Sequence, residues 1–199
     1  MTRQALSLFT QRRTQYALGK NLPLAESEVD ALIRQAIRLA PSSFNSQSSR
    51  AVILFGAAHE QLWNITRETL RPMVPADAFA STDAKMNSFA AGAGTVLFYE
   101  DQDTIKALQQ KFALYADNFP VFSEHSAGMA QFAVWTALAE AGIGASLQHY
   151  APLIDAEVAR TWDVPASWKL RAQMPFGSNE KPLPEKSFIA DEIRFKTVR

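Results

Sequence analysis

Residues 40–55 read Ala-Pro-Ser-Ser-Phe-Asn-Ser-Gln-Ser-Ser-Arg-Ala-Val-Ile-Leu-Phe, a polar loop that runs directly into a short apolar segment. Seven of the eleven residues in 40–50 carry a hydroxyl or amide side chain, which is more hydrogen-bonding capacity than a simple connection requires. Asn45 and Gln47 can each donate and accept in one plane, which suits a flat heteroaromatic ligand with a polar edge. The loop therefore predicts a ligand site, and a solvated helix-to-strand connection is the alternative.

The segments on either side of this loop predict a helix and a strand. Residues 26–39 place apolar side chains at steps of three and four, which is typical of an amphipathic helix, and Pro41 ends it. Ser27 and Asp30 have the spacing of a capping pair at the start of this helix. Residues 51–55 form a continuous apolar run rich in branched side chains, which indicates a fully buried strand.

The rest of the chain predicts further helices around a few strands. Helical patterns cover 59–70, 104–118, 123–141 and 154–162, and Asp103 is the expected N-cap of the second. Strands are expected at 95–99, at 145–147 and, half-exposed, at 168–176. No linker divides the sequence, so we expect one domain over residues 1–199, of the α+β class, with a central mixed β-sheet flanked by helices. Beyond Gly177 the polar, proline-spaced tail has too few neighbours to bury its own apolar side chains.

Composition excludes several classes of function. The 199 residues include 20 basic and 20 acidic ones, so no overall field attracts nucleic acid or an anionic membrane. The absence of cysteine excludes disulfides, thiolate catalysis and cysteine-bound metals. The three histidines lie far apart, so no metal site is expected, and His59 and His125 are expected at exposed helix starts. Without a signal peptide or an uninterrupted apolar span, we expect a soluble, cytoplasmic protein.

A second polar cluster lies near the N-terminus. Arg12, Arg13 and Thr14 place two cations and a hydroxyl in consecutive positions, a set that can bind a phosphate, although an arginine pair can also be a solvated helix end. Together the two clusters resemble the nitroreductase family of flavin enzymes, with its Arg-Arg-Ser/Thr element and its Pro-Ser-Ser-x-Asn-x-Gln loop. The resemblance covers essentially the whole chain and points to the short subgroup that includes a fatty-acid-repression protein and a copper-induced nitroreductase.

This resemblance implies a homodimeric enzyme that binds flavin mononucleotide (FMN). In the family the arginine element binds the phosphate, the loop reaches the isoalloxazine ring from the partner subunit, and the C-terminal extension crosses to the other subunit. The resemblance then implies that FMN is bound by Arg12, Arg13, Thr14, Pro41, Ser42, Ser43, Asn45, Gln47, Lys85, Gly144, Ala145, Ser146, Leu147, Gln148 and Lys186.

Two of these assignments leave an alternative open, and the match at a third element is incomplete. Residues 142–150 fall where the family's backbone approaches flavin N5 and O4, but paired glycines also form helix caps and turns. Lys186 matches the cation that the family's C-terminal element returns to the phosphate, whereas Phe188 replaces a frequent second cation. Lys85 falls in the region that contacts flavin O2, and a solvated lysine is the alternative.

Substrate binding is expected at Phe119, His149 and Tyr150. The sequence around 117–120 breaks a helix, and aromatic side chains at such a break can form one wall of a cleft, with core packing as the alternative. The resemblance implies that NAD(P)H reduces the flavin, which then reduces a nitroaromatic or quinone by a ping-pong mechanism. No protein side chain is needed as a catalyst.

Other motifs fit less well. The Gly-x-Gly segments at 92–94 and 142–144 lack the third glycine of a dinucleotide fingerprint. Residues 144–148 lack the closing glycine of a nucleophile elbow. The alternative functions are a flavin-binding regulatory protein in the lipid or metal and oxidative stress response, with incidental reductase activity, and a flavin-free interaction protein.

Overall fold

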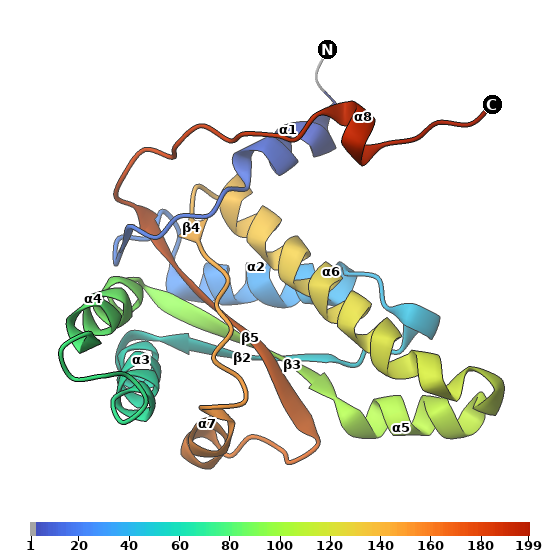
Figure 1. Ribbon diagram of the computed structural model, residues 1–199, viewed down its shortest axis with the longest axis horizontal. Helices are drawn as coiled ribbons and strands as arrows, with labels where there is room; N and C mark the ends of the chain where they lie inside the picture. The colour runs from blue at the N-terminus through green and yellow to red at the C-terminus, as the bar shows by residue number, and fades with distance from the viewer. Residues whose placement is uncertain (1–2) are drawn as a thin grey trace.

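The computed structural model describes residues 3–199 and places a five-stranded sheet between two layers of helices (Figure 1). The strands are β1 (Leu18–Gly19), β2 (Ser49–Phe55), β3 (Gly94–Asp101), β4 (Gly144–Ala145) and β5 (Trp168–Asn179). The helices are α1 (Gln4–Gln11), α2 (Glu26–Leu39), α3 (Gly56–Leu70), α4 (Phe79–Ala90), α5 (Gln102–Lys111), α6 (Phe119–Glu140), α7 (Asp155–Trp162) and α8 (Asp191–Arg194). Two 3-10 helices are η1 (Ser43–Asn45) and η2 (Ala113–Asn118).

The strands follow the order β1-β5-β3-β2, and β4 also pairs with β5. The α+β class is confirmed. All strand pairs among the described residues are antiparallel, so these strands do not form the mixed sheet that the sequence predicts. A parallel pairing occurs at the isolated bridge between Thr14 and Ala145. No helix of the described chain has the length and apolar character to cross a membrane.

Each face of the sheet has its own apolar core. On one face, α2 and α6 bury Val29, Ile33, Val134 and Leu138 against β3 and β5. On the other, α3, α4 and α7 cover the sheet with a cluster that includes Trp63 and Phe89. The predicted helix at 26–39 and the predicted buried strand at 95–99 are confirmed, because both patterns reflect burial on these faces.

Local details correct two predicted caps. The backbone N–H of Ala25 donates to the Glu28 carboxylate at 2.9 Å, so Glu28 rather than Ser27 or Asp30 caps α2. Asp101, not Asp103, is the N-cap of α5, and its carboxylate accepts from the backbone N–H of Asp103.

The helix predicted at 104–118 is also divided, because α5 ends at Lys111 and a 3-10 helix follows. The strand predicted at 145–147 is limited to β4, which ends at Ala145. The strand predicted at 51–55 is longer, and most of it is only half-buried because β2 lies at the edge of the sheet.

The strand predicted at 168–176 is confirmed, but the prediction that it is half-exposed is wrong for most of its length. β5 lies inside the sheet, with β3 on one side and β1 and β4 on the other, so residues 172–177 are fully buried. Two of its polar side chains have partners within the chain: Gln173 Oε1 accepts from the backbone N–H of Tyr150 at 2.8 Å, and Arg171 pairs with Glu124. The alternation of polar and apolar residues therefore reports exposure at Lys169 but not at Gln173.

The exposed position predicted for His59 is also wrong. Its ring lies in the core between α3 and β3, where Nδ1 is 2.8 Å from Thr95 Oγ1 and Trp63 Nε1 donates to the same oxygen at 3.0 Å. Burial lowers the pKa of His59 to about 4. His125 is exposed on α6, as predicted.

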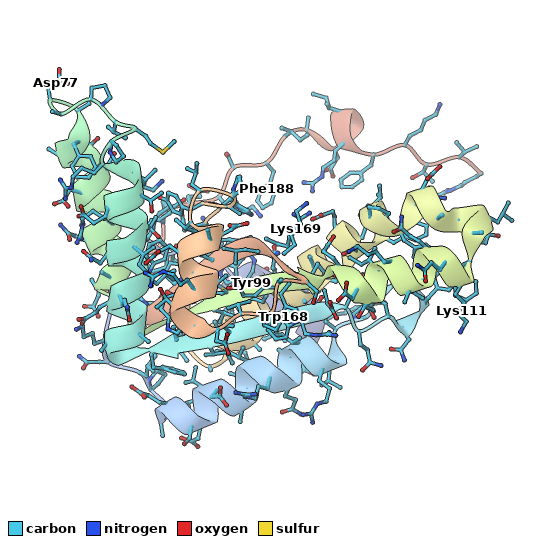
Figure 2. The ribbon with its side chains drawn as sticks, turned by 90° about the horizontal axis from the view of Figure 1, so that it is seen from below. Asp77, Tyr99, Lys111, Trp168, Lys169 and Phe188 are labelled. Carbon is cyan, nitrogen blue, oxygen red and sulfur yellow. The ribbon has the colours of Figure 1, made fainter. Side chains whose placement is uncertain are left out.

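The C-terminal tail leaves β5 and runs past α1, and it ends away from the sheet (Figure 1). Its apolar side chains Phe188, Ile189, Ile193 and Phe195 are exposed within this chain. Figure 2 shows Phe188 on this tail, whereas Tyr99 and Trp168 lie in the body of the molecule with ring centroids 5.8 Å apart. Docking of the tail on a partner subunit stays a prediction.

Candidate functional site

A cleft of about 660 Å³ lies between the segment after α1 and the C-terminal tail. Four cations line it: Arg12, Arg13, Lys181 and Lys186. Thr14 lines it as well, and Ser88 of α4 forms part of its wall. We call this feature the cationic cleft. It combines the predicted phosphate element with the predicted Lys186.

Two hydrogen bonds from side chains to the backbone hold the tail against the N-terminal segment. Arg13 Nη2 donates to the carbonyl of Pro184 at 2.7 Å. Gln15 Nε2 donates to the carbonyl of Lys181, also at 2.7 Å, while Gln15 Oε1 accepts from the backbone N–H of Ala17 at 2.9 Å. Gln15 is only 5% exposed, so the fold itself fixes this contact. Both lysines of the tail reach the cleft because of these bonds.

The charges in the cleft are not compensated by acidic groups. Among residues 3–199, none of the four cations forms an ion pair with a carboxylate. Burial, and then the charge of Arg13, lowers the pKa of the Arg12 guanidinium. Arg12 also lies over the indole ring of Trp135, 4.5 Å from its centroid. Adjacent unpaired cations on fixed supports are suited to a ligand with a phosphate group.

The predicted segment 144–148 lies directly beside the cleft. Thr14 and Ala145 form a β-bridge, and the backbone N–H of Gln15 donates to the carbonyl of Ala145 at 2.9 Å. A Cβ on Gly144 would lie 2.5 Å from Asn179 Oδ1, so this glycine permits close packing. Gly142, at φ +77°, instead follows the end of α6 as a helix-capping residue. The helix-cap alternative therefore holds for Gly142, and the approach of this backbone to a flavin stays a prediction.

The side chains of Ser146 and Gln148 belong to the buried structure. Gln148 Nε2 donates to Ser146 Oγ at 3.1 Å, and Gln148 exchanges two backbone hydrogen bonds with Gln173. Leu147 is half-buried, and His149 is exposed. What this segment offers a ligand at the cleft is therefore mainly backbone.

The loop of residues 42–47 has an unusual and well-supported backbone. Phe44, Asn45 and Gln47 all have positive φ, between 48° and 56°, a region that costs non-glycine residues about 1–3 kcal/mol each. The hydroxyl of Ser42 accepts from the backbone N–H of Gln47 at 3.0 Å, and Ser126 Oγ of α6 accepts from the backbone N–H of Ser43 at 3.2 Å. The side-chain amides of Asn45 and Gln47 are exposed and bond to no described residue. They are available to a ligand.

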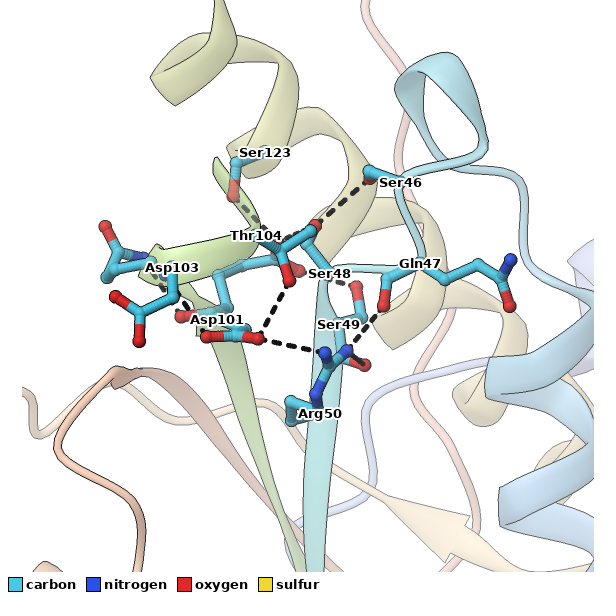
Figure 3. Close-up of polar contacts among 11 residues, drawn as sticks. Ser46, Gln47, Ser48, Ser49, Arg50, Asp101, Asp103, Thr104 and Ser123 are labelled. Carbon is cyan, nitrogen blue, oxygen red and sulfur yellow. Dashed lines mark hydrogen bonds and ion pairs between the residues drawn. The ribbon is translucent and has the colours of Figure 1, made fainter. Parts of the chain in front are cut away.

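A buried carboxylate supports the base of this loop, where Figure 3 shows Ser48, Ser49 and Ser123 near one another. Glu100 of β3 is fully buried, and the hydroxyls of Ser48 and Ser123 donate to its Oε2 at 2.5 Å and 2.7 Å. The hydroxyl of Ser49 donates to Oε1 at 2.5 Å. Ser48 and Ser49 follow the loop directly, whereas Ser123 belongs to α6.

The remaining predicted site residues lie apart from the cationic cleft. Pro41 and the loop line none of it. Lys85 is exposed on α4, one turn before Ser88. Phe119 is only 2% exposed and contacts Phe44 of the loop, with ring centroids 5.3 Å apart. Tyr150 is half-buried, 6.1 Å from the ring of Trp63. The predicted site residues thus lie in separate regions of one chain.

Sequence reasoning missed Gln15, Lys181 and Glu100. Gln15 directly follows the Arg-Arg-Thr element, and this adjacency was the available signal for it. Lys181 reaches the cleft through a contact that spans 166 residues, and Glu100 meets the loop across 51 and 52 residues. No local pattern reports such contacts.

Comparison with known proteins agrees with this architecture. The family model described as "Nitroreductase family" matches residues 9–178. The HBN1 protein of Saccharomyces cerevisiae is 34% identical over 190 residues, with 94% of each chain covered. The nitroreductase CinD of Lactococcus lactis, solved with nicotinic acid, is 48% identical with a TM-score of 0.92, and the match covers 98% of this chain and 100% of that one. CinD was also solved with chloramphenicol and with 4-nitrophenol.

A more distant match shows the fold alone. The nitroreductase of Desulfitobacterium hafniense DCB-2, solved with bound FMN, is 15% identical with a TM-score of 0.73, and the match covers all of both chains. The matching family model, which spans most of the sequence, and the relatives above 30% identity decide the classification. The chain belongs to the nitroreductase family and is an oxidoreductase of that family.

Proposed function

We propose that this protein is an FMN-dependent oxidoreductase that uses NAD(P)H to reduce nitroaromatic or quinone acceptors, and that it works as a homodimer. The observation that carries this proposal is the cationic cleft, whose four cations have no acidic partner among the described residues. Its position beside the segment 144–148 matches what a phosphate-bearing flavin requires.

The residues present fit the phosphate end of FMN. Arg12 and Arg13 offer guanidinium groups that bind a phosphate in a bidentate way, and Lys186 adds a point charge. Lys181 replaces, in part, the cation that Phe188 does not provide. The FMN-bound structure of the D. hafniense nitroreductase supports this cofactor.

The loop of residues 42–47 fits the polar edge of the flavin ring. Asn45 and Gln47 present unoccupied amides on a backbone that is already formed, so little ordering is needed when a ligand binds. Since none of the loop residues lines the cationic cleft, we infer that a second copy of the chain supplies the loop to each cleft.

A second copy would also cover an apolar groove of about 460 Å³ beside α6. Phe9, Leu39 and Phe132 line this groove, and each is more than 40% exposed in the single chain. Gly128, in the middle of α6, is exposed, and a Cβ there would meet nothing within 4 Å. A mid-helix glycine without a neighbour in its own chain permits close approach of another helix. These features support the homodimer.

When bound, FMN supplies the redox chemistry by taking a hydride from the reduced nicotinamide and giving electrons to the acceptor. The chain's own residues bind and orient the reactants. We assign the backbone of Gly144–Gln148 to the flavin ring and Phe119, His149 and Tyr150 to the acceptor side, with Phe119 acting from beneath Phe44. The CinD complexes with nicotinic acid and with two nitroaromatic molecules support this substrate class.

The visible absorption spectrum of protein purified without added flavin tests the proposal. A flavin spectrum, released as FMN on denaturation, is the expected result. Steady-state rates with NAD(P)H and 4-nitrophenol should then give parallel double-reciprocal lines, because both reactants use the flavin in turn. A colourless protein that binds neither FMN nor riboflavin would overturn the proposal.

A further inference from the structure

We propose that Glu100 is a positioning residue that holds the loop of residues 42–47 in the shape that binds the flavin ring. This inference rests on the proposed function, because it assigns a task to a residue behind the ring-binding loop. Glu100 lies in β3 and is fully buried, so it acts through the loop and not by touching the ligand.

The environment of Glu100 is built around its carboxylate. Burying a charged or polar group is unfavourable unless hydrogen bonds replace water. Here the hydroxyls of Ser48, Ser49 and Ser123 donate to both of its oxygens, at 2.5 Å, 2.5 Å and 2.7 Å. A site with this many donors serves a specific arrangement of the elements that carry them.

Those donors connect the loop to α6. Ser48 directly follows Gln47, the last residue of the loop with positive φ, and Ser48 Oγ lies 3.3 Å from Ser46 Oγ. At the other end, Ser126 Oγ accepts from the backbone N–H of Ser43, one turn beyond Ser123 on the same helix. Both ends of the loop are therefore held against one turn of α6, and Glu100 provides the link at the C-terminal end.

This link explains how the loop keeps its strained backbone. Three non-glycine residues with positive φ persist only where the surroundings fix them. If the carboxylate is removed, the hydroxyls of Ser48 and Ser123 lose their common acceptor, and the loop can relax away from the ligand-binding shape. The amides of Asn45 and Gln47 would then have to be ordered when the flavin binds.

A double-mutant cycle on riboflavin affinity tests this role. Riboflavin lacks the phosphate, so its affinity reports on the ring side alone. Glu100→Gln keeps one acceptor oxygen but replaces the other with an NH2 group that can only donate, so the site no longer accepts from all three serine hydroxyls. We expect this variant to weaken riboflavin and FMN alike, by about tenfold. Asn45→Gly keeps the positive φ but removes the amide. In the variant that combines both changes, riboflavin should bind at most about twofold more weakly than in the weaker-binding single variant, because both changes act on one interaction.

The controls separate positioning from general damage. Glu124→Gln changes a neighbouring glutamate that pairs with Arg171 and should leave both affinities unchanged. The losses of FMN-binding free energy in Arg12→Ala and in Glu100→Gln should add in the double variant, because the two sites are separate. If Glu100→Gln does not fold, Ser123→Ala removes one donor and enters the same cycle.

Fluorescence titration of the flavin gives each affinity, and sedimentation shows whether the dimer persists. The positioning role would be overturned if the fold-losses of riboflavin affinity in Glu100→Gln and Asn45→Gly multiply in the double variant. An unchanged riboflavin affinity in Glu100→Gln would overturn it as well. A wild-type protein that binds neither flavin would overturn the proposed function and this inference with it. Wild-type binding with multiplicative losses overturns the inference alone.

Discussion

The cationic cleft is open and its four charges have no described acidic partner, whereas the loop of residues 42–47 is closed by its own hydrogen bonds and backed by a buried carboxylate. In the cleft, the tail is held by two side-chain bonds to backbone carbonyls, from Arg13 and Gln15. In the loop, the strained conformation is fixed by hydroxyl groups from α6 and from the loop itself. The cleft presents unpaired positive charges, whereas the loop presents a fixed backbone conformation.

This difference has a thermodynamic consequence. Attraction between exposed cations and a phosphate weakens as salt is added, because ions screen the charges. Hydrogen bonds from a preformed loop to a neutral ring respond far less to salt. FMN affinity should therefore depend on ionic strength, and riboflavin affinity should not.

Removing the tail should have the largest effect. A chain that ends after Glu180 keeps all of β5 but lacks Lys181 and Lys186, and two lost charge-assisted contacts amount to about 3–6 kcal/mol of FMN binding. If the tail also crosses to the partner, the dimer and riboflavin binding are lost with it. Sedimentation and flavin titration measure both effects.

A chain that ends after Ser187 is the matched control, because it retains both lysines of the cleft. It should bind FMN much better than the shorter chain. A stable, FMN-loaded monomer of the shorter chain would contradict both the phosphate assignment and the interface.

His59 lies in neither region. It should make the stability of the protein depend on pH without changing the difference between FMN and riboflavin binding. Its pKa is lowered from 6.5 to about 4 by burial, so the unfolded chain binds a proton more readily than the folded one between these values. The free energy of unfolding should therefore fall by about 3 kcal/mol as the pH decreases from 6.5 to 4. Chemical denaturation of the flavin-free protein measures it.

His59→Gln removes the titrating group and serves as the control. The variant should be less stable at neutral pH but should lose less stability between pH 6.5 and 4. An identical pH dependence in both proteins would show that other groups cause it.

Arg12→Ala should weaken FMN binding by about 1.5–3 kcal/mol, the range for hydrogen bonds to charged groups. Riboflavin affinity should hardly change, because Arg12 lines the cleft and not the loop. Lys106→Ala, which removes an exposed surface cation, controls for net charge. Equal losses for both ligands would contradict the assignment of Arg12 to the phosphate.

The same comparison shows what a sequence can reveal. Arg12-Arg13-Thr14 and the loop could be recognised because each is a run of consecutive residues with one kind of chemistry. The α2 helix was predicted with its observed bounds because its apolar spacing reports one buried face. Local patterns thus identified both regions and much of the secondary structure.

What the sequence did not reveal depends on distant contacts. The alternation in β5 suggested exposure, yet Gln173 is fully buried inside the sheet, where its Oε1 accepts from the backbone N–H of Tyr150. His59 carried no sign of the Thr95 and Trp63 side chains that meet it in the core. Glu100 resembled any strand residue until the fold placed three hydroxyls around it. Supporting residues of this kind become visible only in three dimensions.

The smallest effect should come from two tryptophans that lie under arginines. One lies beneath Arg12 of the cationic cleft, and the other beneath Arg50, which bonds to the loop. Arg12 is 4.5 Å from the ring centroid of Trp135, and Arg50, whose guanidinium donates to the carbonyl of Gln47, is 5.9 Å from that of Trp168. Replacing Trp135 with Leu should weaken FMN binding by about 0.5–1 kcal/mol, the range for exposed cation–π contacts, with riboflavin unchanged.

Replacing Trp168 with Leu, in contrast, should affect FMN and riboflavin equally or not at all, because Arg50 contacts the loop and not the cleft. Trp135→Phe keeps an aromatic face beneath Arg12 and should recover part of the loss. Titrations of both flavins at two salt concentrations separate these outcomes. If Trp135→Leu weakens riboflavin binding as much as FMN binding, the indole supports the fold in general and not the phosphate contact of Arg12. The proposed division between a cleft that binds the phosphate and a loop that binds the ring would then fail at this residue.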